Sequence, residues 1–202
     1  MKKILFLVNH DIVIYNFRLE IVERFISDGH EVHVSSPNGE RIRDLQQLGV
    51  IYHEIGFERR GMNPLQDYQI ITAYRKLIKD IRPDICLGFT IKPNIYGAIA
   101  ARKYHVPFVA NITGLGTAVE NAGRCQRFIL LLYKYAFRKV QRVFFQNQEN
   151  KEFFERHGLV SDNGTLIPGS GVNLMRFPLS RISKGTNRQI CICQQDYEGE
   201  GH

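Results

Sequence analysis

Apolar residues along the chain fall into two patterns that alternate from one end to the other. Short continuous apolar runs are typical of buried strands, and we expect strands at residues 4–8, 31–35, 50–54, 84–87, 106–111, 142–146 and 165–167. Between them, apolar residues recur with the spacing of a helix that buries one face. These helices are expected at residues 16–29, 39–48, 65–81, 94–104, 124–140 and 151–157.

The alternation of strand and helix predicts an α/β fold, because strands that are apolar on both sides need helices on both faces of the sheet. We therefore expect a Rossmann-like, mostly parallel sheet of about seven strands. Ligands of such sheets bind at the carboxyl ends of the strands. The loops expected to carry chemistry are residues 9–16, 55–64, 88–94, 111–122 and 147–150.

The hydrophobic content of the chain is typical of a globular domain, and its positive net charge predicts an anionic partner. The chain has 202 residues, of which 44% are hydrophobic, and its net charge is +7. This charge predicts a phosphorylated ligand, an anionic lipid surface or a nucleic acid. Nucleic acid is disfavoured, because the spacings of helix-turn-helix and zinc-finger motifs and the signature of an RNA-recognition sheet are missing.

Metal, export and membrane-spanning signals are weak. Cys86 lies in an apolar run and is expected to be a buried thiol, while Cys191 and Cys193 lack a second pair at zinc-ligand spacing. We expect no metal site and a reducing compartment. The opening MKKILFLVN is better explained as a first strand than as a signal peptide. The sequence contains no uncharged apolar stretch of about 18 residues, so no transmembrane helix is predicted.

The loop after the first strand, NHDIVIYNFR, contains no glycine. A dinucleotide-binding domain would carry a glycine-rich turn here, so a dehydrogenase is disfavoured and no cofactor is expected. Asn16 and Arg18 are candidate ligand residues at this edge. Arg18 either binds an anionic ligand or pairs with Glu20 or Asp11, and His10 with Asp11 either forms the start of a helix or has a functional role.

The loop after the fourth strand, GFTIKPN, is a candidate anion site. Lys92 and Asn94 lie where the next helix begins, and a helix N-terminus beside a lysine favours anions. Thr90 adds a hydroxyl group. The alternative is purely structural, because Pro93 also suits the first turn of a helix.

The loop after the fifth strand, NITGLGTAVENAG, contains two glycines at the carboxyl end of a strand. Gly114 and Gly116 permit unusual backbone angles and close approach of a ligand. Together with Thr113 and Thr117 they are candidates to hold a phosphate or a sugar.

The helix expected at residues 124–140 carries cations and large apolar groups on one arc of its helical wheel. The members of this arc are Arg124, Arg127, Phe128, Leu131, Lys134, Tyr135, Arg138 and Arg142. We favour a helix that rests on anionic lipid headgroups. A solvated basic face is the alternative.

Five segments, in order, resemble bacterial family 4 glycosyltransferases of the GT-B fold. They are KILFLVNHDIVIYNFR, IRPDICLGFTIKPNIYGAIAA, VPFVANITGLGT, VFFQNQENKEFF and IPGSGVNLMRF. The chain is most similar to the capsular and O-antigen polysaccharide subgroup, which includes N-acetylgalactosaminyltransferases that act on undecaprenyl-diphosphate sugars. The resemblance covers about residues 2–178.

The resemblance implies a retaining transferase with two Rossmann-like domains, of which the N-terminal one binds the acceptor. The implied substrates are a lipid-linked saccharide acceptor and a nucleotide-sugar donor, with UDP as the expected nucleotide. The protein would be cytoplasmic and peripherally associated with the inner face of the cell membrane. The resemblance also implies that Lys92, Asn94 and residues 114–117 line the cleft between the two domains, with Asn16 and Arg18 nearby.

The resemblance also bears on domain organisation. Residues 1–178 are expected to form the acceptor-binding domain, and residues 179–202 an aberrant, disordered tail that replaces the donor domain. The chain by itself is then expected to be inactive in glycosyl transfer. The alternative is a non-enzymatic Rossmann-like module that binds a membrane glycolipid or a partner protein.

Overall fold

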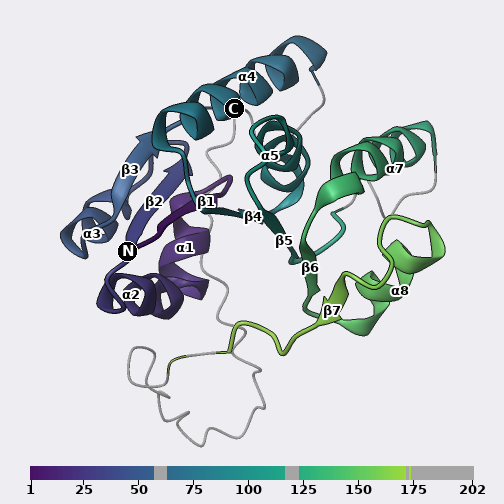
Figure 1. Cartoon of the computed structure of the whole chain (residues 1–202). Coiled ribbons are helices and arrows are strands. Elements are labelled where there is room, and N and C mark those ends of the chain that lie inside the picture. The colour runs from purple at the N-terminus through teal and green to yellow at the C-terminus, as the bar shows by residue number, and fades with distance from the viewer. Residues whose placement is uncertain (57–62, 117–122, 172, 174–202) are drawn as a thin grey trace, which may run out of the picture. The chain divides into compact units, whose positions relative to one another are not determined.

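Seven parallel strands form a single sheet with the order β3-β2-β1-β4-β5-β6-β7 (Figure 1). The structure is a computed structural model that describes residues 1–56, 63–116, 123–171 and 173. The strands are β1 (Lys3–Leu7), β2 (Glu31–Ser36), β3 (Ile51–Glu54), β4 (Ile85–Phe89), β5 (Phe108–Ile112), β6 (Arg142–Phe145) and β7 (Gly164–Leu166). The predicted α/β fold with a parallel sheet is confirmed.

Helices connect the strands and cover both faces of the sheet. They are α1 (Asp11–Phe17), α2 (Leu19–Ser27), α3 (Ile42–Gln47), α4 (Pro64–Ile81), α5 (Ile91–Lys103), α7 (Arg124–Ala136), the 3-10 helix η1 (Phe137–Lys139) and α8 (Gln148–Arg156). Figure 1 shows α4, α5 and α7 along one side of the sheet and α1 and α2 along the other. In the part of the chain that the structure describes, no helix has the length and apolarity needed to cross a bilayer.

The central strand β1 supplies both layers of the core. Leu5 and Leu7 pack in the cluster formed with α4 and α5. Ile4, Phe6 and Val8 point the other way, into the cluster formed with α1 and α2. Because successive strand residues face opposite sides, a strand buried on both faces must be continuously apolar, as this one is.

Helix α5 lies directly on the sheet because two glycines leave room for it. A Cβ atom added to Gly97 would lie 2.6 Å from Leu7 Cδ1 and 2.9 Å from Phe108 Cε2. A Cβ atom on Gly88 of β4 would lie 2.5 Å from Phe108 Cζ and 2.6 Å from Asn94 Oδ1. These distances are too short for any side chain, so the first turn of α5 is held against the carboxyl ends of β4 and β5.

Among the helix starts that differ from the sequence-based predictions, two lie next to loops expected to carry chemistry. The helix expected at residues 16–29 is two helices that meet at Arg18, whose φ of −138° is not helical. Helix α5 begins at Ile91, earlier than the expected start at residue 94, because Thr90 turns the chain with a φ of +69°. The expected loops 9–16 and 88–94 are therefore partly helical.

The basic helix is also shorter than predicted. Its α-helical part ends at Ala136, and η1 follows. Arg142 is the first residue of β6 and does not belong to the helical arc to which it was assigned. The tail expected at residues 179–202 lies outside the described residues.

A pair of histidines joins the edge strand β3 to β2. His33 Nδ1 lies 2.9 Å from His53 Nε2, and His33 Nε2 lies 2.7 Å from Glu31 Oε1. Glu31 in turn pairs with Lys3 Nζ at 3.2 Å. Burial lowers the pKa of His53, and the neighbouring His33 lowers it further. The two rings can share one proton between their facing nitrogens only while at least one of them is neutral.

We predict that this pair makes the fold sensitive to acid. A depressed pKa means that the folded state binds fewer protons than the unfolded chain below the ordinary histidine pKa of about 6.5. The contribution is therefore fully present above that value and decreases as the pH falls toward the folded-state pKa of His53. Urea unfolding of His53→Gln between about pH 5 and pH 7.5 should show a flatter dependence of unfolding free energy on pH.

The matched control is His105→Asn, because His105 is exposed and asparagine tolerates its φ of +57°. This control should retain the pH dependence of the unmodified chain. An unchanged slope in His53→Gln would rule out the histidine pair as its source.

Candidate functional site

The strand order places a topological switch point at the carboxyl edge of the sheet between β1 and β4. The chain leaves β1 toward β2 on one side, while β4 lies on the other side of β1. The loops after these neighbouring strands diverge, and such switch points are where open α/β sheets bind ligands. Asn9 follows β1, Thr90 follows β4, and Asn111 belongs to the end of β5.

Four side chains at this edge have a buried oxygen atom that accepts no hydrogen bond from any described residue. They are Asn9 Oδ1, Thr90 Oγ1, Asn94 Oδ1 and Asn111 Oδ1. Asn94 is only 1% exposed, and its Nδ2 donates to Asn111 O at 2.9 Å, which fixes the orientation of its amide. Buried acceptors without partners are costly. A ligand that brings hydroxyl donors would satisfy them, and the absence of charge on all four side chains favours a neutral ligand.

Thr90 carries backbone strain at the same place. Its φ of +69° and ψ of 168° are unusual for a β-branched residue. It occupies the N-cap position of α5, yet its side chain makes no capping hydrogen bond. A strained residue whose hydroxyl is left free at a helix start is a candidate for ligand binding.

Lys92 is already paired with an acidic residue. Its Nζ lies 3.2 Å from Asp67 Oδ1 on α4, and both side chains are largely buried. Asp67 also faces Tyr96: burial raises the pKa of the Tyr96 hydroxyl well above its ordinary value, and the charge of Asp67 raises it further. The predicted anion site at Lys92 and the N-terminus of α5 is therefore partly neutralised.

The glycine loop after β5 is only partly as predicted. Gly116 has a φ of +73°, and a Cβ atom there would lie 2.9 Å from Ile91 Cδ1. Gly114 is exposed and has open space around it, and it does not adopt a positive φ. Gly116 therefore needs to be glycine, whereas Gly114 only leaves its loop uncrowded. Thr117 lies outside the described residues.

Of the two candidates near α1, Arg18 is buried and Asn16 is half-exposed. Arg18 Nη1 donates to Phe17 O at 2.6 Å and to Ser170 Oγ at 2.6 Å. Its guanidinium carbon lies 5.1 Å from the ring centre of Phe89 at the end of β4. None of the ion pairs between described residues involves Arg18, so the pairing suggested by the sequence is not made.

His10 and Asp11 organise the loops of this edge. His10 is the N-cap of α1 and accepts from Ile12 N at 3.2 Å. The buried carboxylate of Asp11 accepts from Ile12 N at 2.9 Å and from Arg41 N at 2.7 Å, which ties α1 to the loop after β2. Gly39 in that loop contacts the Asp11 carboxylate so closely that a side chain there would clash. The helix-start interpretation of this pair is therefore supported.

Asp67 and Ser170, which contact Lys92 and Arg18, were not predicted. Asn9 and Asn111 begin two of the loops that were expected to carry chemistry, residues 9–16 and 111–122, because each stands at the carboxyl end of a predicted strand. No local signal identifies Asp67 or Ser170, whose partners are remote in sequence.

The predicted outer face of α7 is exposed, and the apolar face packs inward as expected. Exposed members of the predicted arc are Arg127, Phe128, Leu131, Lys134, Tyr135 and Arg138. The side chain of Arg124 lies outside the described residues. A hollow of about 360 Å³ is lined by Arg127, Leu130, Leu131, Lys134, His157 and Leu159. The face thus combines cations with an apolar depression.

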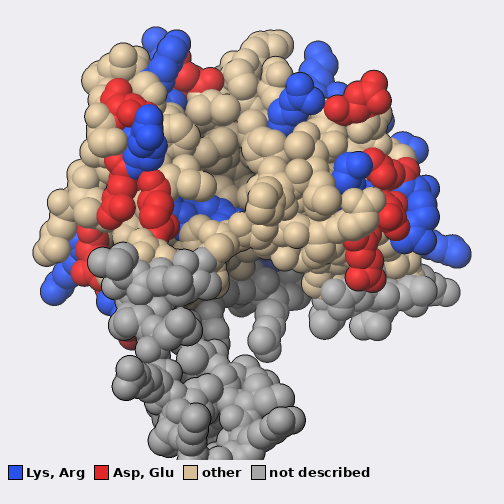
Figure 2. All heavy atoms as spheres, turned by 90° about the horizontal axis from the view of Figure 1, so that it is seen from below, with Lys and Arg blue, Asp and Glu red and all other residues tan. Residues whose placement is uncertain are grey.

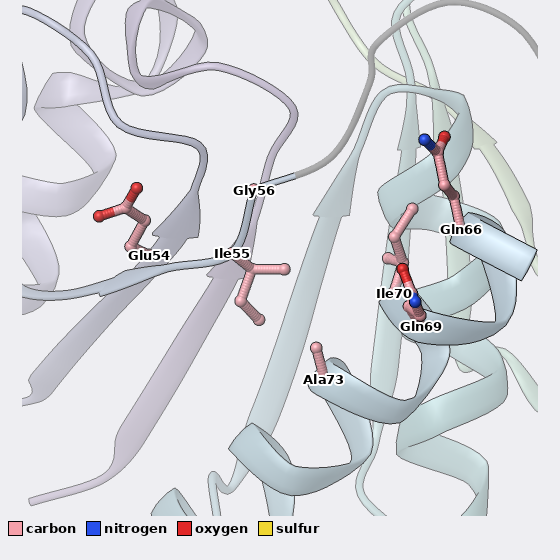
Figure 3. Close-up of a pocket in the computed structure, with 7 residues that line it drawn as sticks. All are labelled: Glu54, Ile55, Gly56, Gln66, Gln69, Ile70 and Ala73. Atoms are coloured by element: carbon pink, nitrogen blue, oxygen red, sulfur yellow. The ribbon is translucent and has the colours of Figure 1, made fainter.

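A second cavity of about 500 Å³ lies between the end of β3 and the first half of α4 (Figure 3). It is lined by Glu54, Ile55, Gly56, Gln66, Gln69, Ile70 and Ala73. Figure 3 shows Ile55 pointing toward α4, whereas the carboxylate of Glu54 points away from it. No lysine or arginine lines this cavity among the described residues.

Comparison with known proteins identifies relatives. Residues 3–147 match the model of the family described as glycosyl transferase 4-like. Over 169 residues the chain is 29% identical to the N,N'-diacetylbacillosaminyl-diphospho-undecaprenol alpha-1,3-N-acetylgalactosaminyltransferase of Campylobacter jejuni. This match covers 81% of the chain and 45% of that protein, so the chain spans about half the length of its curated relative.

Solved structures show the same fold at low sequence identity. A glycosyltransferase from Rickettsia africae superposes with a TM-score of 0.66 at 17% identity, over 88% of this chain and 45% of its own. HepE of Anabaena, solved in complex with UDP and glucose, superposes with a TM-score of 0.56 at 17% identity, over 84% of this chain and 44% of its own.

We predict that the positive φ of Thr90 lowers the free energy of unfolding. Thr90→Gly should raise the unfolding free energy by about 1 kcal/mol, since relief of the unfavourable φ outweighs the entropy cost of glycine. Chemical denaturation measures this change. Thr113→Gly is the matched control, because Thr113 is an exposed threonine of the same edge without a positive φ. It should be neutral or destabilising, and equal effects of the two changes would contradict strain at Thr90.

Proposed function

The chain belongs to the glycosyl transferase 4-like family, and from this premise we propose that it forms the acceptor-binding side of an enzyme that transfers a sugar from a nucleotide-sugar to a lipid-linked saccharide. The name of the Campylobacter jejuni relative describes such an acceptor, a saccharide joined to undecaprenol through a diphosphate. HepE was solved with UDP and glucose bound, which supports a UDP-sugar as donor. The product would enter a surface polysaccharide such as a capsule or O-antigen.

The observation that carries this proposal is the cluster of unpartnered oxygens at the switch point. Asn9, Thr90, Asn94 and Asn111 present acceptors without charge, and sugar hydroxyls are the common biological ligands that offer neutral donors in number. The cations of the edge stand beside this cluster, with Lys92 in the first turn of α5 and Arg18 against the end of β4. Neutral acceptors next to cations suit a saccharide that is joined to a diphosphate.

These side chains bind and orient a hydroxyl rather than take its proton. None of the four carries a titratable group, so in the proposed reaction Asn94 and Asn111 direct the acceptor hydroxyl and Thr90 adds a further contact. The proton of that hydroxyl would pass to the departing phosphate of the donor, with the anomeric configuration retained. This scheme assigns no general base to the cluster.

We further propose that α7 rests on an anionic membrane. Arg127, Lys134 and Arg138 are exposed together with Phe128 and Leu131, of which Leu131 is 66% exposed. Basic side chains around large apolar groups are typical of helices that lie in the headgroup region. A protein at the inner face of the cell membrane would meet a lipid-linked acceptor there.

The acceptor proposal predicts that Asn94→Leu weakens saccharide binding. Titration calorimetry with a water-soluble, short-chain lipid diphospho-saccharide should show a loss of at least about tenfold, because a bond to a buried amide is removed. The matched control is Asn163→Leu, since Asn163 donates from Nδ2 to Val140 O at 3.0 Å and already accepts from Ser161 N at 3.2 Å. This control should lose stability and retain affinity. Equal affinity of Asn94→Leu and the unmodified chain would refute the acceptor site.

The membrane proposal predicts loss of vesicle binding after charge reversal on α7. Changing Arg127, Lys134 and Arg138 to glutamate should lower binding to phosphatidylglycerol vesicles at least about 100-fold, since each basic residue contributes about 1 kcal/mol near an anionic surface. Flotation at low and high salt measures the effect, which salt should reduce. Arg43, Lys76 and Lys79 are exposed on α3 and α4, and their reversal is the charge-matched control. Equal loss in both variants would leave net charge as the explanation and exclude a face on α7.

A further inference from the structure

Arg18 is a buried cation that has no acidic partner among the described residues. The residue is 4% exposed, and its guanidinium hydrogen bonds go to a carbonyl and a hydroxyl. The carboxylate of Asp11 is engaged elsewhere, by Ile12 N, Arg41 N and His10 Nδ1. Burying a charge without compensation is costly, and such groups normally find a counterion. Among the described residues, the buried guanidinium of Arg18 therefore has no counterion.

The guanidinium is held rigidly, with donors to spare. Both hydrogen bonds of Arg18 leave from Nη1, although a guanidinium carries five N–H groups. The ring of Phe89 lies 5.1 Å from its central carbon. Burial lowers the pKa of Arg18, but a guanidinium remains charged at neutral pH. The Nε and Nη2 groups thus form a fork that is fixed and charged.

Ser170 adds a hydroxyl donor beside this fork. Its Oγ accepts from Arg18 Nη1 at 2.6 Å and from Gln146 Nε2 at 3.4 Å. A hydroxyl that accepts twice has its own hydrogen left to donate. Gly169 and Gly171 flank it with open space at their Cα atoms, and Gly171 has a φ of +68°. The main chain on both sides of Ser170 can therefore be approached closely by a ligand.

Three strand ends meet at this point. Arg18 links α1 to α2, Phe89 ends β4, Gln146 follows β6, and Ser170 lies in the segment after β7. That segment runs along the lower side of Figure 1. The view from this side shows Lys or Arg atoms near the centre of the face, with Asp or Glu atoms beside them (Figure 2).

We propose that Arg18 and Ser170 bind a phosphate or diphosphate group of the substrate. A rigid guanidinium fork matches two oxygens of a phosphate, and bonds of this kind are among the strongest that side chains make. Arg18 suits this role better than Lys92, whose charge is shared with Asp67. The assignment of this group to a substrate rests on the proposed function. In that function a diphosphate joins the sugar to the nucleotide in the donor and to the lipid in the acceptor.

The site is tested by titrating the full chain with inorganic pyrophosphate in a calorimeter. Arg18→Met should weaken binding at least about 30-fold and Ser170→Ala about three- to tenfold, because hydrogen bonds to charged groups are lost. Arg18→Lys keeps the charge without the fork and should give an intermediate affinity. Arg24→Met is the control, since Arg24 is an exposed arginine of α2 that pairs with Asp28; it should bind like the unmodified chain.

Stability separates this site from a merely structural arginine. An unpaired buried cation costs free energy, so Arg18→Met should leave the Tm unchanged or raise it and should abolish the rise in Tm that pyrophosphate causes. A structural tie between Arg18 and Ser170 predicts the reverse, a lower Tm and no dependence on pyrophosphate. No rise in the Tm of the unmodified chain at millimolar pyrophosphate would overturn the proposal.

Two further ligands identify the source of the diphosphate. Farnesyl diphosphate that binds more tightly than pyrophosphate would assign the site to the lipid-linked acceptor, and UDP that binds more tightly would assign it to the donor. Either result requires the same dependence on Arg18. Pyrophosphate contains no sugar, so its binding would persist even if Asn94→Leu showed that the saccharide site is wrong.

Discussion

The close packing of α5 on the sheet positions most of the candidate site. Gly88 and Gly97 have no side chains, and this lets the helix lie on β4 and β5 at a distance that any Cβ atom would prevent. The first turn of α5 is thereby brought over the carboxyl ends of these strands. Asn94 then reaches the main chain of Asn111, and the chain must turn sharply at Thr90 to enter the helix. This steric constraint thus places Thr90 and Asn94 at the carboxyl edge of the sheet.

The electrostatics of this edge divide it into two parts. The centre holds uncharged acceptors, and of the two cations beside it Lys92 is balanced by Asp67, while Arg18 has no acidic partner among the described residues. A buried cation without a counterion and a threonine with positive φ are both expected to cost folding free energy. Residues of this kind persist where they bind a ligand, because the ligand supplies what the fold leaves out. The arrangement suits a substrate with a neutral saccharide next to a diphosphate.

The exposed face of α7 is held in place by residues other than those at the carboxyl edge of the sheet. Tyr133 anchors it through edge-to-face contacts with Phe137 of η1 and Phe154 of α8, and the rings of Phe137 and Phe154 meet at a tilted angle. On its outer surface the ring of Tyr135 contacts the guanidinium groups of Arg102 and Arg138. Mutations that test the proposed membrane contact are therefore expected to leave the proposed saccharide site intact.

Much of the fold was predictable from local pattern. Continuous apolar runs predicted every described strand, and the helical wheel of α7 predicted which side chains, such as Leu131 and Tyr133, face outward and inward. These patterns are periodic within a single element, so the sequence carries them directly. Lys92 and Asn94 were also predicted to lie where a helix begins after the fourth strand, because such a helix start is a local feature of the sequence.

The contacts that define the site were decided by tertiary structure. Arg18 and Ser170 are 152 positions apart, and Asn94 and Asn111 are 17 apart. Local periodicity shows that a face is buried, but it does not show which distant side chain will lie opposite. Whether Arg18 would find a carboxylate, and whether Lys92 would keep its charge free, depended on how α1, α4 and the segment after β7 pack around the sheet. The sequence determined the elements and their buried faces, and the packing of those elements determined which charges are balanced.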